Sequence, residues 1–313
     1  MYLINNISFK LAETHESNLD INILNKFSID DKFILNKIGT INRYISNNKD
    51  SSYDLGLDAT KLLIHETSPK IDKLDLLVLV TQNPGVNIPH ISSRIHQTLK
   101  FNSSCQTFDI SLGCTGFTQG LDIVMSYLSH NNLNNCILIT SDQYSNIIDN
   151  NDKSTYLIFS DAASATYISK SKKGFQLIDK AFYLDSSYST SISTHNKVLN
   201  MNGWEVIKFI EMNIKDHIYK ILSNNDLTID DINYFIFHQG SKYILDLIKK
   251  ILEIPDVKIV YDINETGNTV SSSIPIALKK HILPNIKNND KILISGFGVG
   301  LSIFSNIICY SDE

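Results

Sequence analysis

The segment "IDKLDLLVLVTQ" (71–82) has a near copy later in the chain, "IDDINYFIFHQ" (229–239). Each starts with polar residues typical of a helix end, continues as four or five apolar residues and leaves through a polar exit. Apolar runs of this length between polar boundaries are typical of buried strands. One such pair could arise by chance, so its meaning depends on whether the rest of the chain repeats in the same order.

Two further pairs preserve both order and spacing. The segment "CQTFDISLGCTG" (105–116) is echoed by "KIVYDINETGNT" (258–269), and "NNCILITSD" (134–142) is echoed by "NDKILISGF" (289–297). The offsets of the three pairs are 158, 153 and 155 residues. Helical patterns lie between the echoes, and apolar strands that alternate with helices form sheets covered on both faces. We therefore predict an α/β protein made of two similar halves.

The 313 residues suffice for one large or two medium cores, and the repeat divides them near 1–170 and 171–313, packed as one body. Apolar residues make up 42% and charged residues 19%, as in ordinary globular proteins. A net charge of −5 gives no basic footprint for nucleic acids or anionic membranes. The run Leu74–Val80 is strand-sized, and the N-terminal "MYLINNISFKLAE" lacks the features of a signal peptide. We expect a cytoplasmic protein.

One of the four cysteines differs from the others in its surroundings. Cys105, Cys136 and Cys309 are scattered without C-x-x-C pairing, which is typical of reduced thiols. Cys114 lies in G-C-T-G, between a strand pattern and the helical run that begins at Phe117. A thiol at a helix N-terminus has a lowered pKa and is a better nucleophile. A small buried hydrophobic residue is the other interpretation, and position alone does not separate the two.

Two more chemically capable residues lie at strand exits of the duplicated pattern, where α/β folds collect their ligands. His238 follows "YFIF"; it is either a core histidine or a neutral imidazole that donates to a developing negative charge. Asn268, in "ETGNTVSSSIP", is either a helix cap or an amide donor to an oxyanion. The duplication brings Cys114, His238 and Asn268 to corresponding exits, which favours a shared site.

The glycine-rich "GFGVG" (296–300) follows a third strand pattern and could expose the backbone N–H of Val299. It lacks the full G-x-G-x-x-G pattern with its following acidic residue, so dinucleotide binding is a weak alternative. The remaining histidines show no ligand spacing with cysteines or carboxylates, so we expect no metal site.

Together these motifs identify a family. The chain resembles, over nearly its whole length, the β-ketoacyl-acyl-carrier-protein synthase III family of thiolase-like condensing enzymes. The resemblance rests on "GCTGF", "FHQGS", "GNTVSSSIP", "GFGVG", "MNGWEVIKF" and "DKFILNKIGTINRYI". It implies a thiolase-like fold, in which two duplicated α/β halves form a layered α-β-α-β-α body. The half 1–170 would carry the nucleophilic cysteine, and the half 171–313 the histidine and the asparagine.

The resemblance also implies a two-stage reaction. An acyl group would move from acyl-coenzyme A, or from an acyl carrier protein, onto Cys114. His238 and Asn268 would then donate to the carbonyl of a malonyl-carrier thioester as it loses carbon dioxide, and a 3-oxoacyl thioester would form. Backbone N–H groups of Cys114 and of the Gly298–Gly300 loop, Val299 included, would hold the oxyanion. Coenzyme A thioester and carrier protein would be substrates, and no metal or redox cofactor is implied.

The chain departs from the family pattern where the donor binds. Positions that carry Trp and Arg against the coenzyme A head group hold Phe33, Lys37 and Lys153 here. Aromatic and cationic character is kept, but lysine cannot make the bidentate phosphate contact of arginine. The asparagine usual after Gly203 is Trp204, a fourth candidate for substrate binding.

Two further departures concern the acceptor and one loop. The arginine expected five residues after the histidine, used for docking the carrier protein, is Tyr243. The glycine-rich "GDGAGA" is "SDAASA" (160–165), which puts the path of that loop in question. An alternative activity therefore stays open: a non-decarboxylating acyltransferase that passes the acyl group from Cys114 to an amine or alcohol of a sugar or secondary metabolite. A non-catalytic partner subunit is disfavoured, because the nucleophile is retained.

A homodimer is the family expectation. In relatives, a loop just before a proline reaches into the acyl pocket of the partner. The matching segment here is "GVNIPH" (85–90), which makes Ile88 a candidate for setting acyl size.

Overall fold

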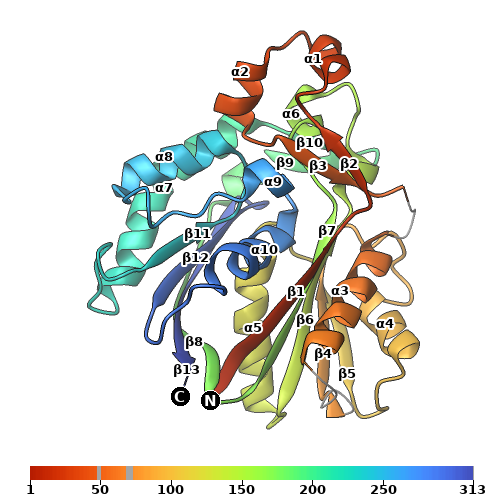
Figure 1. Cartoon of the computed structure of the whole chain (residues 1–313), viewed down its shortest axis with the longest axis vertical. Helices are drawn as coiled ribbons and strands as arrows, with labels where there is room; N and C mark the ends of the chain where they lie inside the picture. Colours follow the sequence, from red (N-terminus) through yellow and green to blue (C-terminus); the bar gives the residue numbers. More distant parts are fainter. Residues whose placement is uncertain (48–50, 68–72, 313) are drawn as a thin grey trace.

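A computed structural model describes residues 1–47, 51–67 and 73–312. Its centre is a sheet of nine strands in the order β11-β12-β13-β8-β1-β7-β6-β4-β5 (Figure 1). The strands are β1 (Tyr2–Leu11), β4 (Leu76–Val80), β5 (Gln106–Ile110), β6 (Asn135–Asp142), β7 (Ala162–Lys170), β8 (Lys173–Leu184), β11 (Tyr234–Phe237), β12 (Lys291–Gly298) and β13 (Ser302–Asp312).

The sheet falls into two groups of strands that follow the chain. Strands β1, β4, β5, β6 and β7 come from its first part, and β8, β11, β12 and β13 come from its second part. Within the groups, β4 runs parallel to β5 and β6, and β11 runs parallel to β12. The groups join where Leu3 and Ile4 of β1 pair with Gln176 and Phe175 of β8.

Helices lie outside and between the two groups, as Figure 1 shows. Helices α3 (Ser51–Thr67) and α4 (Ile91–Leu99) cover the first group, and α7 (Gly203–Ser223) and α8 (Lys242–Leu252) lie beside the second. Helices α5 (Gly116–His130) and α10 (Ser273–Ala277) pack between the groups. The result is the layered α-β-α-β-α body that the resemblance predicts.

The central position of α5 follows from its sequence. Phe117, Leu121, Val124 and Leu128 recur at helical spacing and are all fully buried. They share one apolar core with residues of β4 and β12, such as Val80. This packing holds the N-terminus of α5, and with it Cys114, against the ends of strands from both groups.

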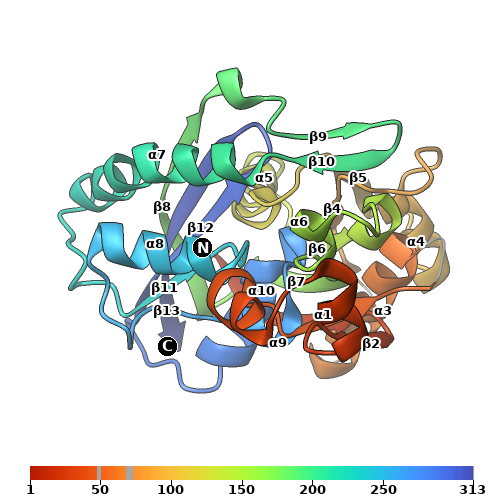
Figure 2. The ribbon, with the colours of Figure 1, turned by 90° about the horizontal axis from the view of Figure 1, so that it is seen from above.

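Short elements cover the upper end of the molecule in Figure 1. They are the hairpins β2 (Thr14–Ser17)–β3 (Asn42–Ile45) and β9 (Ile192–His195)–β10 (Val198–Met201), helices α1 (Ile21–Phe27), α2 (Asp31–Phe33) and α6 (Lys153–Tyr156), and the π-helical segment Ile34–Ile38. In Figure 2, α6 lies between the β9–β10 hairpin and α1, whose Phe27 packs on Tyr156. In the described part of the chain, no helix has the length and apolarity needed to span a membrane.

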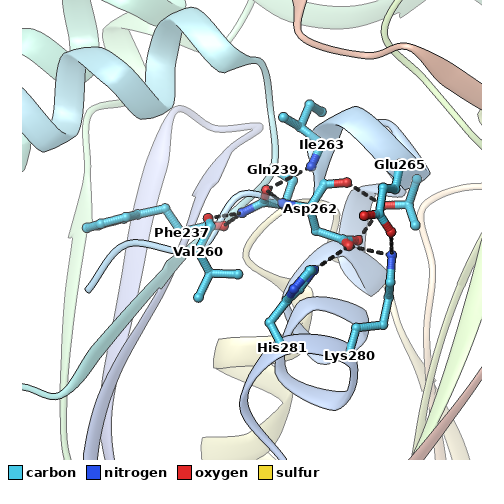
Figure 3. A network of polar contacts seen from close by, with 9 residues as sticks. Phe237, Gln239, Val260, Asp262, Ile263, Glu265, Lys280 and His281 are labelled. Atoms are coloured by element: carbon cyan, nitrogen blue, oxygen red, sulfur yellow. Dashed lines mark hydrogen bonds and ion pairs between the residues drawn. The ribbon is translucent and has the colours of Figure 1, made fainter. Parts of the chain in front are cut away.

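The echoed segments differ in how far they form strands. Two pairs become β4 with β11 and β6 with β12, although residues 71 and 72 lie outside the described part of the chain. The echo of β5, residues 258–269, makes only an isolated bridge between Ile259 and Phe235. The side chain of Gln239 bonds to the backbone of Val260 and Asp262, so these groups do not continue a ladder (Figure 3).

Candidate active site

Cys114, His238 and Asn268 line one cavity of about 860 Å³. Cys114 lies between β5 and α5, His238 directly follows β11, and Asn268 follows the short helix α9 (Ile263–Thr266). Their exposed fractions are 9%, 2% and 4%. The structure thus brings together three residues that are separated by up to 154 positions in the sequence.

The end of β12 packs directly on the cysteine. A Cβ atom placed on Gly298, whose φ is +155°, would lie 2.8 Å from both Cβ and Sγ of Cys114. The backbone of Val299 and the backbone of Cys114 itself both hydrogen-bond the thiol sulfur and favour its ionised form. Two backbone N–H groups, from opposite halves of the chain, therefore converge on the nucleophile candidate.

The pKa of the Cys114 thiol is nevertheless high. Burial, and next the negative charge of Asp142, raise this pKa to about 12, against the opposing hydrogen bonds from the backbone. The lowered pKa expected from the strand–helix join is therefore wrong for the free protein. The reason is that the sequence shows the helix N-terminus but not the desolvation around the sulfur.

His238 is held as a neutral imidazole. Burial lowers its pKa to about 3, and a smaller contribution from the backbone of Val270 opposes this shift. Its Nδ1 lies 2.8 Å from Oγ of Ser273, and its ring meets Phe297 edge-on with centroids 5.4 Å apart. The remaining nitrogen, Nε2, lies on the side of the ring near Gly240, which also lines the cavity.

The amide of Asn268 has a defined orientation. Its Oδ1 accepts a hydrogen bond of 2.9 Å from the backbone N–H of Val270. Its backbone N–H donates to the carbonyl of Ile158, and its carbonyl accepts from the N–H of Ser160, each at 2.9 Å. The oxygen side of the amide is thus occupied, and the Nδ2 group is the donor available to a molecule in the cavity.

A polar network fixes the backbone that follows His238 (Figure 3). Oε1 of Gln239 accepts from the N–H groups of Asp262 and Ile263, at 2.7 and 3.1 Å. The fully buried carboxylate of Asp262 binds Lys280 at 2.6 Å and His281 at 2.7 Å. These two partners help to hold the pKa of Asp262 below its usual value against the opposing effect of burial, which is the larger single contribution.

The four residues predicted to bind the donor line the outer part of the same cavity. They are Phe33, Lys37, Lys153 and Trp204. The ammonium of Lys153 lies 5.7 Å from the ring centre of Phe33, and that of Lys37 lies 5.1 Å from the ring centre of Tyr243. Trp204 is 80% exposed. Aromatic rings next to ammonium groups suit a flat, anionic ligand head.

The inner wall of the cavity is apolar, and sequence reasoning missed it. Its residues include Tyr144, Phe159, Ile192, Met201 and Ile207. The ring of Tyr144 packs on Phe159 with centroids 4.9 Å apart, and its hydroxyl donates to Oε1 of Gln82 at 3.2 Å. Tyr144 lies two residues beyond β6, so the strand-exit rule that singled out Cys114 could have found it.

Two predicted residues stand apart from the cavity lining. Ile88, between β4 and α4, is 88% exposed, so its role toward a partner stays a prediction. Gly300 follows Gly298 and Val299, which do line the cavity, and its φ is +133°.

Known proteins resemble this chain in sequence and in structure. The family model 3-oxoacyl-[acyl-carrier-protein (ACP)] synthase III matches residues 108–186, and the model of its C-terminal part matches residues 222–310. A beta-ketoacyl-[acyl-carrier-protein] synthase III of Campylobacter curvus is 30% identical over 301 residues, 90% of each chain. That of Clostridium novyi is 29% identical over 294 residues, 89% of this chain and 90% of the relative.

Solved structures agree with the family models. The crystal structure of the 3-oxoacyl-[acyl-carrier-protein] synthase III from Aquifex aeolicus is 26% identical, covers 99% of this chain with its whole length, and superposes with a TM-score of 0.91. The resemblance read from the motifs is therefore confirmed, as is the thiolase-like fold. The chain belongs to the 3-oxoacyl-[acyl-carrier-protein] synthase III family and is a condensing enzyme of that family.

Proposed function

We propose that the protein takes an acyl group from a coenzyme A or carrier-protein thioester onto Cys114 and condenses it with malonyl-carrier protein. The observation that carries this proposal is the shared cavity. It holds one thiol, two side chains suited to donate to a carbonyl, and backbone N–H groups beside the sulfur. These groups suit both stages of a decarboxylative condensation, the acylation of the thiol and the attack of the carbanion on the acyl group.

In the first stage, the sulfur of Cys114 attacks the thioester carbonyl of the donor. The N–H groups of Cys114 and Val299 donate to the developing oxyanion, and Gly298 leaves room for it beside the sulfur. The new carbon–sulfur bond replaces the one to the donor, and the departing thiolate leaves with the proton of the cysteine. Because the free thiol has a high pKa, deprotonation accompanies attack rather than preceding it.

In the second stage, a malonyl thioester enters the emptied outer cavity. Nε2 of His238 and Nδ2 of Asn268 donate to its thioester carbonyl, which stabilises the enolate left when carbon dioxide departs. The carbanion attacks the acyl-cysteine, the carbon–sulfur bond breaks, and a 3-oxoacyl thioester leaves. The cysteine thiolate that is released then takes up one proton from solvent and returns to the thiol. A neutral histidine suits this role, because it can hold an N–H toward the carbonyl without protonating the carbanion.

The donor thioester and the carrier protein are substrates here, and the proposal needs no metal or redox cofactor. The rings of Phe33 and Trp204 and the ammonium groups of Lys37 and Lys153 frame the opening where a nucleotide head would lie. An apolar inner wall then receives the acyl chain. The activity would place the protein in fatty-acid or related lipid synthesis in the cytoplasm.

We also propose a homodimer in which residues 1–170 and 171–313 act as the two halves of each subunit. Strand β5 is an edge strand of the sheet and so offers a free ladder to a second copy. Ile88, on the neighbouring loop, is far more exposed than a large apolar residue usually is. Its insertion into the acyl pocket of the partner would bury it and set acyl size.

A second candidate is transfer of the acyl group from Cys114 to an amine or alcohol without decarboxylation. The observation in its favour is the cavity opening, where Tyr243 and Trp204 replace residues that the family uses at this surface. Aromatic rings of this kind stack well on sugars and other flat small molecules.

Intact-mass measurement and carbon dioxide release separate the two candidates. The protein is first incubated with a panel of acyl-coenzyme A and acyl-carrier donors, and the acyl adduct on Cys114 is measured. Malonyl-carrier protein is then added, and Cys114→Ala protein treated with the same donor serves as the blank. Release of carbon dioxide together with a 3-oxoacyl product supports condensation. Discharge of the adduct by amines or alcohols alone would contradict condensation, if malonyl-carrier protein releases no carbon dioxide whichever donor was used to acylate Cys114.

A further inference from the structure

His238 has a hydroxyl partner that lies outside the cavity lining. Oγ of Ser273, the first residue of α10, is 2.8 Å from Nδ1 of His238. The same oxygen accepts a weaker hydrogen bond of 3.4 Å from the backbone N–H of Gln239. Ser273 is 2% exposed and His238 is also 2% exposed, so water does not compete for this contact from bulk solvent.

The direction of the Ser273 contact can be worked out by counting donors and acceptors. A serine hydroxyl has one hydrogen to donate and two lone pairs to accept with. Within residues 1–47, 51–67 and 73–312, Nδ1 of His238 is the acceptor that the structure provides for this hydroxyl. If Nδ1 carried the hydrogen instead, the buried serine hydrogen would be left without an acceptor, which is unfavourable because water cannot replace the missing partner.

In the opposite direction the Ser273 hydroxyl, the N–H of Gln239 and Nδ1 of His238 all have a partner. Gln239 donates to Oγ, the hydroxyl of Ser273 donates to Nδ1, and the hydrogen of the neutral ring then resides on Nε2. The backbone of Val270 raises the pKa of His238, but by less than burial lowers it, so the ring stays neutral and carries a single hydrogen. Nε2 is the nitrogen that faces the cavity side, near Gly240.

We propose that Ser273 is a positioning residue that holds His238 in the tautomer with its hydrogen on Nε2. The inference rests on the proposed condensation, because an Nε2–H is needed to donate to the malonyl thioester carbonyl. The other tautomer would turn a lone pair toward the developing enolate and oppose it. Acylation of Cys114 uses backbone donors only, so it does not depend on Ser273.

The test is Ser273→Ala, with Ser272→Ala as its matched control. Ser272 is the preceding residue, fully buried, and its hydroxyl contacts Thr140 instead of the histidine. Both variants are assayed for acylation of Cys114 by intact mass and for release of carbon dioxide from malonyl-carrier protein. We expect Ser273→Ala to acylate within twofold of the wild type and to release carbon dioxide 10- to 100-fold more slowly. Ser272→Ala should keep both rates within about threefold.

A spectroscopic readout makes the inference independent of activity. The ¹⁵N signals of His238, assigned by their loss in His238→Gln, report which ring nitrogen carries the hydrogen. We expect Nε2–H in the wild type and a mixture of tautomers in Ser273→Ala. Nδ1–H in the wild type, or equal losses of decarboxylation in the two serine variants, would overturn the inference. If wild-type protein never decarboxylates malonyl-carrier protein, the proposed function fails, and the tautomer is still decided by the spectrum.

Discussion

Gly298 packs against Cys114 so closely that a methyl group on its Cα would lie 2.8 Å from the sulfur. The two residues come from opposite halves of the chain, 184 positions apart in the sequence. Their contact brings the N–H of Val299 to the sulfur and keeps the space beside it open for a carbonyl oxygen. The oxyanion site is thus made by tertiary packing between a strand end and a strand–helix join.

The first prediction follows from this contact. Gly298→Ala should slow acylation of Cys114 by at least 100-fold, because the methyl group displaces the sulfur or the Val299 N–H, and one lost oxyanion donor raises the barrier by about 3–4 kcal/mol. Intact mass against time measures the rate. The control is Gly174→Ala, a glycine at φ +139° whose added Cβ would meet the carbonyl of Ile4 far from the site. Equal slowing in both variants would mean that general destabilisation, not the oxyanion site, is responsible.

The second prediction separates the two stages of the reaction. Asn268→Asp keeps the size of the side chain but replaces the amide donor with a carboxylate. We expect release of carbon dioxide from malonyl-carrier protein to fall 100- to 1,000-fold, as for loss of an oxyanion donor. Acylation of Cys114 by acyl-coenzyme A should persist within several-fold. A variant that loses acylation to the same degree as decarboxylation would show that Asn268 acts on both stages or holds the fold.

The third prediction concerns the lysines at the cavity opening. Both side chains are exposed, so each contributes modestly to binding of phosphate groups, about 0.2–1 kcal/mol. Lys37→Ala combined with Lys153→Ala should raise KM for acyl-coenzyme A by about three- to tenfold, more at low salt than at high salt. KM for an acyl-pantetheine without phosphates should not change. Equal increases for both donors would place the lysines outside the head-group site.

The fourth prediction is a pH dependence of stability. His217, on α7, is 7% exposed, and its Nε2 lies 2.9 Å from Oγ of Ser305. Burial, with a smaller effect of Lys220, lowers its pKa to about 4 from an ordinary value of 6.5. Between pH 4 and pH 6.5 the imidazole of His217 is protonated in the unfolded chain but neutral in the folded protein. The contribution of His217 to the free energy of unfolding is therefore complete above pH 6.5 and is lost as the pH falls toward 4.

The measurement is the midpoint of thermal unfolding from pH 7.5 to 4.5 for the wild type and for His217→Gln. The variant should be less stable at pH 7.5, and its stability should fall less steeply with acidification. Across this pH range the free energy of unfolding of the wild type should fall by up to about 3 kcal/mol more than that of the variant. Parallel curves for the two proteins would contradict the low pKa of His217. His238 also has a lowered pKa and is present in both proteins, so the comparison isolates His217.

Several features of the fold could be predicted because they depend on local pattern. The apolar runs that became β4, β6, β11 and β12 have the length and polar boundaries of buried strands, and their spacing revealed the duplication. The third echo, 258–269, did not form the strand that its pattern suggested. The side chain of Gln239 bonds to the backbone groups that a strand would pair with its neighbour. A contact from a residue 21 or more positions away cannot be read from the pattern of the segment itself.

The amino-acid sequence by itself determined which chemical groups stand at strand exits: the thiol of Cys114, the imidazole of His238 and the amide of Asn268. Residue type and position along a strand suffice for that, because strand ends are local features. Tertiary structure alone decided how these groups behave. Burial and Asp142 raise the thiol pKa, Ser273 meets Nδ1 of the histidine, and Val270 turns the asparagine amide. Desolvation and hydrogen-bond direction depend on every atom nearby, and most of those atoms belong to distant parts of the chain.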